Sequence, residues 1–132
     1  PEIKDLINFL KKLGANIKQS GRTITINENK KKKSEAKHEI MFDRIETGTY
    51  MIASALVGKK IIIDKINTKI IKTEIEILRK IGLEIKKKKF SVTVRKNRAL
   101  KNINLLTKPY PGFPTDLQAH LDLSNAFFGM MI

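Results

Sequence analysis

The sequence repeats itself at an offset of 68 residues, and this repeat limits the possible folds more than any other feature of the chain. The first half of the repeat aligns Ile7, Leu10, Lys12, Leu13, Gly14, Ile17 and Lys18 with Ile75, Leu78, Lys80, Ile81, Gly82, Ile85 and Lys86. Farther along, TITI at 23–26 aligns with SVTV at 91–94. A repeat of this kind indicates one supersecondary unit that is used more than once.

Each copy of the repeat predicts a helix followed by a β-hairpin. Apolar residues at helical spacing form a stripe over 3–13 and again over 71–81, and a glycine, Gly14 or Gly82, ends each stripe. Short β-type runs then predict two strands in each copy, at 15–18 and 23–27 and at 83–85 and 90–94.

After each hairpin the pattern predicts a further strand, a loop and a second helix. The additional strands are expected at 38–42, 104–106 and 60–64, and the second helices at 47–57 and 115–128. The predicted fold class is therefore α/β, built from repeated βαβαββ-like units. Because narrow apolar stripes need sheets to cover them, each unit is expected to pack against others.

Composition excludes several kinds of protein. The 132 residues include 27 Lys+Arg and 13 Asp+Glu, which gives a net charge of +14, but there is no Trp, and Lys far outnumbers Arg. Nucleic-acid surfaces rely on Arg and on aromatic stacking, so this lysine excess indicates solvated faces, and no nucleic-acid partner is expected. The absence of Cys excludes disulfides and Cys-ligated zinc within these residues.

Two further features bear on location and completeness. No apolar run approaches the roughly 20 residues of a membrane span, and the start lacks a signal-peptide pattern, so a cytoplasmic protein without a membrane partner is predicted. The chain does not begin with Met and stops within an apolar sequence, GMMI, which indicates a piece of something longer.

The first loop-to-helix junction, residues 43–50, reads DRIETGTY. Thr47 or Thr49 is expected to cap the helix, and Gly48 is expected to let another backbone approach closely. Three charged residues precede the helix: Asp43, Arg44 and Glu46. Their simplest interpretation is a salt-bridged turn that fixes the angle at which the chain enters the helix.

The second junction, residues 108–120, reads KPYPGFPTDLQAH. Its prolines and glycine forbid regular structure and stiffen the loop. Thr115 to Gln118 then fit a capping box with Thr115 as the N-cap, and Asp116 falls in the first turn, where the helix dipole favours a carboxylate. Asp116 could simply start the helix, but a stiff loop that holds one carboxylate in place favours a catalytic role.

Other candidate residues are weaker. His120 follows Asp116 by four residues, so the two share a helix face and could form a carboxylate–imidazole pair. A metal site would need at least one more ligand, so neither a metal nor a cofactor is expected. His38 stands alone in a strand pattern and is interpreted as structural. The chain contains no phosphate loop of the Walker or Rossmann type and no nucleophile elbow.

Two strings resemble the signatures of the bacterial UDP-N-acetylglucosamine enolpyruvyl transferases: DRIETGT at 43–49 and PGFPTDLQA at 111–119. The similarity covers essentially the whole chain but only the middle third of such an enzyme. It implies the inside-out α/β barrel fold of these transferases, incomplete in this chain. Residues 1–42 would end one domain, and residues 43–132 would begin the return through the other, truncated at the C-terminus.

The resemblance also implies a reaction, the transfer of enolpyruvyl from phosphoenolpyruvate to the 3-hydroxyl of UDP-N-acetylglucosamine with release of phosphate, in peptidoglycan synthesis. By motif match Asp116 would be the catalytic carboxylate, and the substrate-binding residues would be Asp116, Thr115, Asp43, Arg44 and Glu46. No cofactor and no obligate protein partner are implied. His120 replaces the Gln that is usual at its position, which weakens the case for its pairing with Asp116.

The family's mobile-loop Cys, its Lys-Asn pair and its C-terminal arginines are not among these residues, so the chain alone is expected to be inactive. Two alternatives remain open. One is a transferase of the sister family in the shikimate pathway, which does not usually carry the proline-rich string. The other is a non-catalytic, lysine-rich module that binds nucleic acid.

Overall fold

A computed structural model describes residues 1–28, 35–96, 100–101 and 103–127, of which 123–127 are described by their backbone alone. The chain divides into two compact units, Pro1–Met41 (unit 1) and Phe42–Ile132 (unit 2). The boundary lies one residue before the predicted start of the first loop-to-helix junction. Each unit is described by itself.

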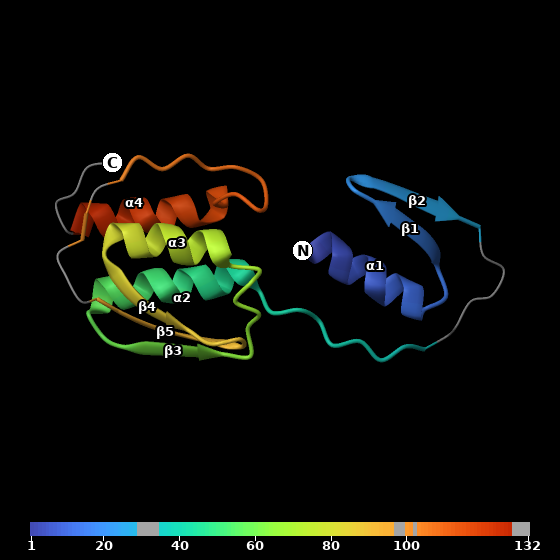
Figure 1. Ribbon diagram of the computed structural model, residues 1–132, viewed down its shortest axis with the longest axis horizontal. Coiled ribbons are helices and arrows are strands. Elements are labelled where there is room, and N and C mark those ends of the chain that lie inside the picture. The colour runs from blue at the N-terminus through green and yellow to red at the C-terminus, as the bar shows by residue number, and fades with distance from the viewer. Residues whose placement is uncertain (29–34, 97–99, 102, 128–132) are drawn as a thin grey trace. The chain divides into compact units, whose positions relative to one another are not determined.

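Unit 1 consists of helix α1 (Glu2–Lys12) and a hairpin of strands β1 (Asn16–Ser20) and β2 (Thr23–Asn27), shown in blue in Figure 1. Gly14 follows the helix with φ 97°, a conformation that glycine adopts at the least cost, so the predicted helix stop is confirmed. Among the described residues of this unit, the only buried apolar side chains are Ile7 and Ile17. Unit 1 therefore has a very small core.

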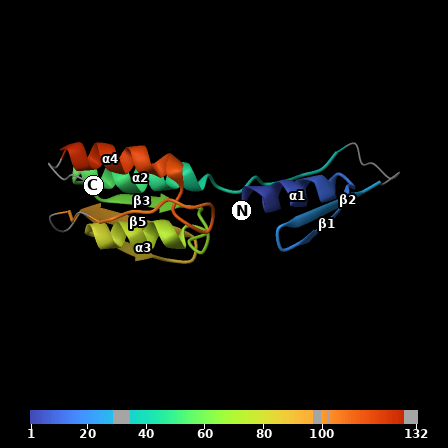
Figure 2. The same ribbon diagram turned by 90° about the horizontal axis from the view of Figure 1, so that it is seen from above.

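Unit 2 packs two helices on one face of a three-stranded sheet, and a third helix packs on one of them from outside. The elements in chain order are α2 (Arg44–Val57), β3 (Ile61–Asp64), α3 (Lys72–Ile81), β4 (Leu83–Lys87), β5 (Ser91–Lys96), the 3₁₀ turn η1 (Thr115–Leu117) and α4 (Gln118–Phe127). The strand order is β3-β5-β4, and both pairs are antiparallel. α2 and α3 lie next to the sheet, and α4 is the outermost helix and packs on α2 (Figures 1 and 2).

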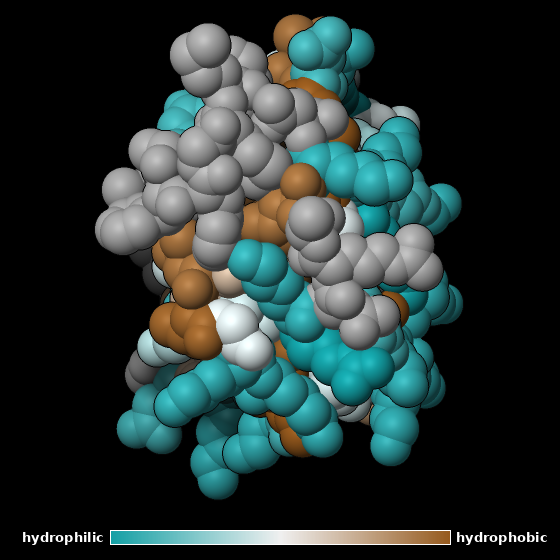
Figure 3. Space-filling model, turned by 90° about the vertical axis from the view of Figure 1, so that its left-hand side faces the viewer, coloured by the Kyte–Doolittle hydropathy of each residue, from teal (hydrophilic) through white to brown (hydrophobic). Residues whose placement is uncertain are grey.

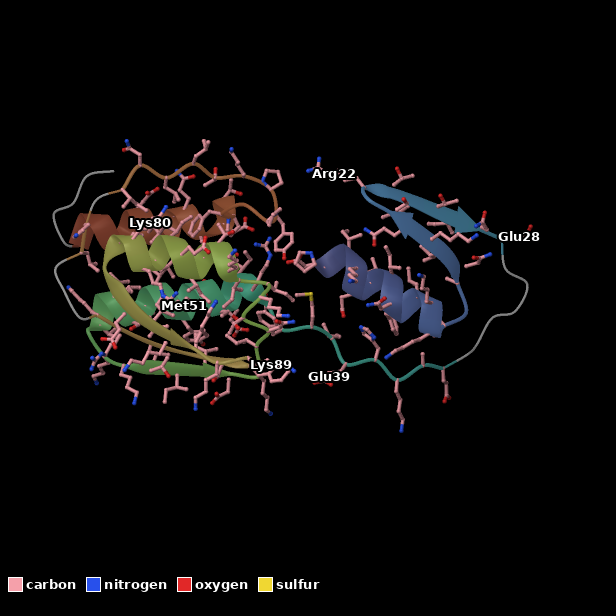
Figure 4. The ribbon with its side chains drawn as sticks, in the orientation of Figure 1. Arg22, Glu28, Glu39, Met51, Lys80 and Lys89 are labelled. Carbon is pink, nitrogen blue, oxygen red and sulfur yellow. The ribbon has the colours of Figure 1, made fainter. Side chains whose placement is uncertain are left out.

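The core of unit 2 forms where α2 and α3 meet the sheet. Alternate strand residues point inward, so Val92 and Val94 of β5 are completely buried. Met51 on α2 is likewise completely buried and lies within this unit in Figure 4, whereas Lys80 and Lys89 lie at its surface. The α/β fold class predicted from the sequence is confirmed.

The repeat is confirmed at the level of strand register. The pairs Ile17↔Ile26 in unit 1 and Ile85↔Val94 in unit 2 differ by the same 68 positions at both residues. Their surroundings differ, because β3 pairs with β5 and α2 packs against it in unit 2. As a result Ile26 is 71% exposed, whereas its counterpart Val94 is completely buried.

Two strand predictions are wrong. Residues 38–42 and 104–106 have irregular backbone, and the nearest pairing to the second segment is an isolated bridge between Thr107 and Phe113. A strand needs a neighbouring strand to satisfy its backbone, and an apolar run supplies none by itself. Around 38–42 a side chain takes that role, because the Met41 amide donates to the Asp5 carboxylate at 3.5 Å. The repeated βαβαββ unit and the inside-out barrel therefore stay a proposal.

The lysine runs lie at the surface. Lys86, Lys87, Lys88 and Lys89 are all exposed at the hairpin between β4 and β5, and the run at 30–33 falls outside the described residues. Figure 3 shows one face of the molecule, on which hydrophilic side chains surround smaller hydrophobic areas. In the described part of the chain, every helix is too short or too polar to cross a bilayer.

We expect unit 1 to open well before unit 2. Unit 1 has two buried apolar side chains, whereas the core cluster of unit 2 has fifteen. The free energy needed to open a unit rises with the apolar area that it buries. In native-state hydrogen exchange, the β1–β2 amides should exchange at least about tenfold faster than those of β4–β5. Equal protection of the two hairpins would contradict this expectation.

A second expectation concerns pH. The hydrogen bond from His38 Nε2 to Asp5 Oδ2, 3.1 Å long, holds the pKa of the Asp5 carboxyl below its usual range. A lowered pKa means that the pair stabilises unit 1 above the ordinary Asp value and that this contribution is lost as pH falls through the lowered value. His38 and Met41 resonances should therefore shift together in an acid NMR titration. Asp5→Asn should abolish that transition and leave the resonances of unit 2 unchanged.

A candidate active site at two helix N-termini

Helix α2 begins at a side-chain cap that the sequence analysis assigned to the wrong residue. Asp43 is the N-cap, and its Oδ1 accepts hydrogen bonds from the amides of Ile45 at 2.7 Å and Glu46 at 3.0 Å. Thr47 and Thr49 lie inside the helix, where each hydroxyl donates to the carbonyl four residues earlier. Because Asp43 satisfies the first free amides, the helix starts at Arg44, three residues before the predicted start at Thr47.

The proline-rich loop is closed by its own backbone. The Lys108 amide donates to the Phe113 carbonyl at 2.9 Å, and the Gly112 amide donates to the Pro109 carbonyl at 2.8 Å. Phe113 is 1% exposed and anchors the loop in the core of unit 2. The stiffness predicted from the prolines is thus reinforced by two hydrogen bonds and a buried aromatic anchor.

The capping box predicted at the second junction does not form. The N-cap position is Pro114, without a side-chain hydrogen bond, and the chain first makes the 3₁₀ turn η1, in which the Leu117 amide donates to the Pro114 carbonyl at 3.3 Å. The Gln118 amide, which the Thr115 hydroxyl was expected to satisfy, donates to the Thr115 backbone carbonyl. Thr115 and Asp116 are exposed on this turn, and the Leu117 side chain is completely buried.

The two junctions meet through Gly48 and Leu117. A Cβ atom at Gly48 would lie 2.3 Å from Leu117 Cδ1, so any side chain at this position would force Leu117 to shift. The predicted close approach at Gly48 is therefore real, but a side chain approaches there and not a backbone. This contact joins the first turns of α2 to the turn that carries Asp116.

Arg44 forms an ion pair with a residue that is distant in the sequence. Its Nη1 lies 3.2 Å from Glu74 Oε1 in the first turn of α3, and its Cζ lies 5.5 Å from the centroid of the Tyr110 ring. Asp43 and Glu46 are exposed at the same end of α2. The structure thus brings Arg44, Glu74 and Tyr110 together from three separate elements.

The sequence analysis missed Glu74 and Thr73. The Thr73 hydroxyl donates to the Pro111 carbonyl at 2.6 Å, so the first turn of α3 also holds the loop directly. One signal for Glu74 was present in the repeat, because this charged residue aligns with the apolar Leu6. No comparable signal pointed to Thr73.

His120 contacts the backbone of Asp116 and not its carboxylate. Its Nδ1 lies 3.0 Å from the Asp116 carbonyl oxygen, an atom that only accepts, so Nδ1 is the donor. The suggested carboxylate–imidazole pair is therefore replaced by a local bond that steadies the turn. Across the described ranges, no group of three or more His, Cys, Asp or Glu side chains is placed to hold a metal ion.

The chemical capacity of this arrangement follows from its parts. An exposed carboxylate stands at the N-terminal end of α4, on a turn fixed by buried residues on both sides. Such a group can accept a hydrogen bond and a proton from a hydroxyl that is brought to it.

The sequence profile of the EPSP synthase (3-phosphoshikimate 1-carboxyvinyltransferase) family matches residues 1–128, and the chain belongs to this family.

Its relatives carry a more specific name. A UDP-N-acetylglucosamine 1-carboxyvinyltransferase of Pelagibacter ubique is 48% identical over 121 residues, which are 92% of this chain and 29% of that protein. Proteins of the same name are 41% identical over 128 residues in Haemophilus ducreyi, with 96% of this chain and 30% of that protein covered, and 42% identical over 121 residues in Halothermothrix orenii, with 92% and 29% covered. The chain thus spans less than a third of the length of these relatives.

Proposed function

We propose that this chain is the central part of an enzyme that transfers enolpyruvyl from phosphoenolpyruvate to the 3-hydroxyl of UDP-N-acetylglucosamine. The observation that carries the proposal is the 48% identity to a relative of that name over 92% of the chain. A match of 121 residues within 132 must include both junctions of the candidate site. The whole enzyme would act in peptidoglycan synthesis, and the cytoplasmic location stays a prediction.

In this proposal Asp116 is the catalytic residue. A C–O bond forms between the sugar hydroxyl oxygen and the enol carbon, the bond from that carbon to phosphate breaks, and the hydroxyl proton needs an acceptor. Asp116 orients the hydroxyl by accepting its hydrogen bond and takes the proton as the new bond forms. Its exposure on a rigid turn supports this role.

The remaining site residues have supporting roles in the proposal. Thr115 is exposed next to Asp116, and Asp43 and Glu46 are exposed at the start of α2, where each can contact substrate. Arg44 belongs to the same site, with most of its side chain buried. Unit 1 would end one domain of the enzyme, and unit 2 would begin the other.

The test is an assay of phosphate release that depends on both substrates. The full-length enzyme should release phosphate only when phosphoenolpyruvate and UDP-N-acetylglucosamine are both present. The 132-residue chain should show no turnover, because the expected groups for stabilising phosphate charge lie outside it. Transferase activity of the isolated chain would refute the second expectation, and an inactive full-length enzyme would refute the proposal.

Two further arms of the assay test the alternatives. Replacing UDP-N-acetylglucosamine with 3-phosphoshikimate tests the reaction named for the family as a whole, and we expect no phosphate release with it. A salt titration of RNA binding tests the lysine-rich module. Tight binding that weakens steeply with salt would favour that module, because phosphate contacts release counterions.

A further inference from the structure

We infer that Glu74 is a positioning residue, whose carboxylate holds the Arg44 guanidinium beneath Tyr110 and thereby fixes the loop that carries Asp116. The inference deepens the proposed function, since it names what positions the proposed catalytic group. It depends on contacts within unit 2 and is testable without any measurement of activity.

The place of Glu74 in the repeat is the first argument. The apolar stripe of α1 includes Leu6, and the equivalent position of α3 holds Glu74, which is 1% exposed. Burying a carboxylate costs free energy that an apolar residue at the same place would not incur. If α3 had only to pack on its sheet, leucine at position 74 would give the more stable packing. The buried carboxylate must therefore have a role other than packing.

The geometry around Arg44 supplies that explanation. The Arg44 side chain is 11% exposed, with Nη1 at 3.2 Å from Glu74 Oε1 and Cζ at 5.5 Å from the Tyr110 ring centroid. A guanidinium group is planar, so it can donate along its edge to a carboxylate while its face lies against an aromatic ring. Glu74 thus sets the position of the surface on which Tyr110 rests.

A neighbouring contact shows that the first turn of α3 grips this loop. Thr73 bonds directly to the carbonyl of Pro111, and Glu74 reaches Tyr110 through Arg44. Two consecutive helix residues therefore hold two consecutive loop residues. Beyond them the chain passes through buried Phe113 and Leu117, so the position of Asp116 between these anchors follows that of the loop.

This arrangement assigns Arg44 a role within the proposed site. Since its guanidinium group is largely buried between α3 and the loop, Arg44 contributes to the proposed site by supporting Tyr110 and with it the loop that carries Asp116. A lysine at this position would keep the charge but would lose the planar group that both contacts use.

The test is hydrogen exchange by NMR on the 132-residue chain. Its readouts are the loop amides of Lys108 and Gly112, which close the proline-rich loop, and the amides of β5, which report on the core. Glu74→Gln should speed exchange of the loop amides by about tenfold or more and that of the β5 amides by less than about threefold. Glu76→Gln is the matched control, because Glu76 is an exposed carboxylate on the same helix, and it should change neither.

A double variant separates positioning from stability. The double variant Glu74→Leu, Arg44→Leu replaces a buried ion pair with an apolar pair. The β5 amides should then exchange at rates near wild type, whereas the loop amides should exchange as fast as in Glu74→Gln. If loop and β5 amides speed up in parallel in both variants, Glu74 is merely structural and the inference fails. Unchanged loop exchange in Glu74→Gln would overturn it as well.

Kinetics of the full-length enzyme separate this inference from the proposed function. Glu74→Gln should lower kcat about tenfold with little change in KM for the sugar nucleotide, because the catalytic carboxylate is displaced while binding contacts persist. An inactive wild-type enzyme with the expected exchange pattern would contradict the proposed function but not the positioning role of Glu74. Wild-type kinetics in Glu74→Gln would contradict the positioning role of Glu74 but not the proposed function.

Discussion

Replacing Asp116 with Asn in the full-length enzyme is expected to lower turnover by about 10²–10⁴, the usual effect of losing an acid–base group. An amide has the size of the carboxylate but cannot take the hydroxyl proton. The fold should survive, because Asp116 is exposed and His120 bonds to its backbone carbonyl, which the substitution keeps. The loss of favourable interaction with the helix dipole should cost no more than about 1 kcal/mol.

The control for this prediction is Asp122→Asn. Asp122 is also exposed and lies six residues farther along the chain, on α4, so its replacement makes the same chemical change away from the candidate site. Steady-state phosphate release should be near wild type in this control. If Asp116→Asn also keeps its rate while both substrates bind, Asp116 only starts the helix and the proposed catalytic role is wrong.

The second large effect concerns packing between Gly48 and Leu117. Leu117→Ala should lower the free energy of unfolding by about 2–5 kcal/mol, because a completely buried leucine leaves a cavity. Gly48→Ala introduces a Cβ at 2.3 Å from Leu117 Cδ1 and should cost about 1–3 kcal/mol through overpacking, partly offset by the higher helix propensity of alanine. Urea unfolding of the 132-residue chain measures both.

The double variant gives this prediction its control. With alanine at both positions, the atoms that would collide with the new Cβ are gone, so the combined loss should be smaller than the sum of the two single losses. Coupling of about 0.5–3 kcal/mol is expected for residues in such contact. Strict additivity would show that the α2 helix and the η1 turn do not pack as described.

The elements that were predicted correctly depend on short-range patterns. Both helices of the repeat, with the glycines that end them, and both hairpins follow from periodicity and from the conformational freedom of glycine. Residues 38–42 show where this reasoning fails. Ile40 belongs to the predicted strand but is 79% exposed, since no strand among the described residues of unit 1 pairs with it. Whether an apolar run becomes a strand depends on a partner that the run does not specify.

The candidate site divides in the same way. The stiff loop and the carboxylate at the start of a helix were predicted, because prolines and first-turn acids act locally. The caps were misassigned at both junctions, where several polar residues compete for the same amides and backbone geometry decides among them. Glu74 was missed because its partner Arg44 lies 30 residues away.

The sequence alone determines the repeated helix and hairpin, the rigid loop and the family of this chain. Only the tertiary structure decided that Arg44 pairs with Glu74, that Leu117 lies over Gly48 and that Asp116 remains exposed between buried neighbours. The physical reason is the distance along the sequence over which each kind of interaction acts. Helix and turn preferences act over a few residues, whereas these contacts join segments that are distant in the sequence and meet only when the core of unit 2 has formed.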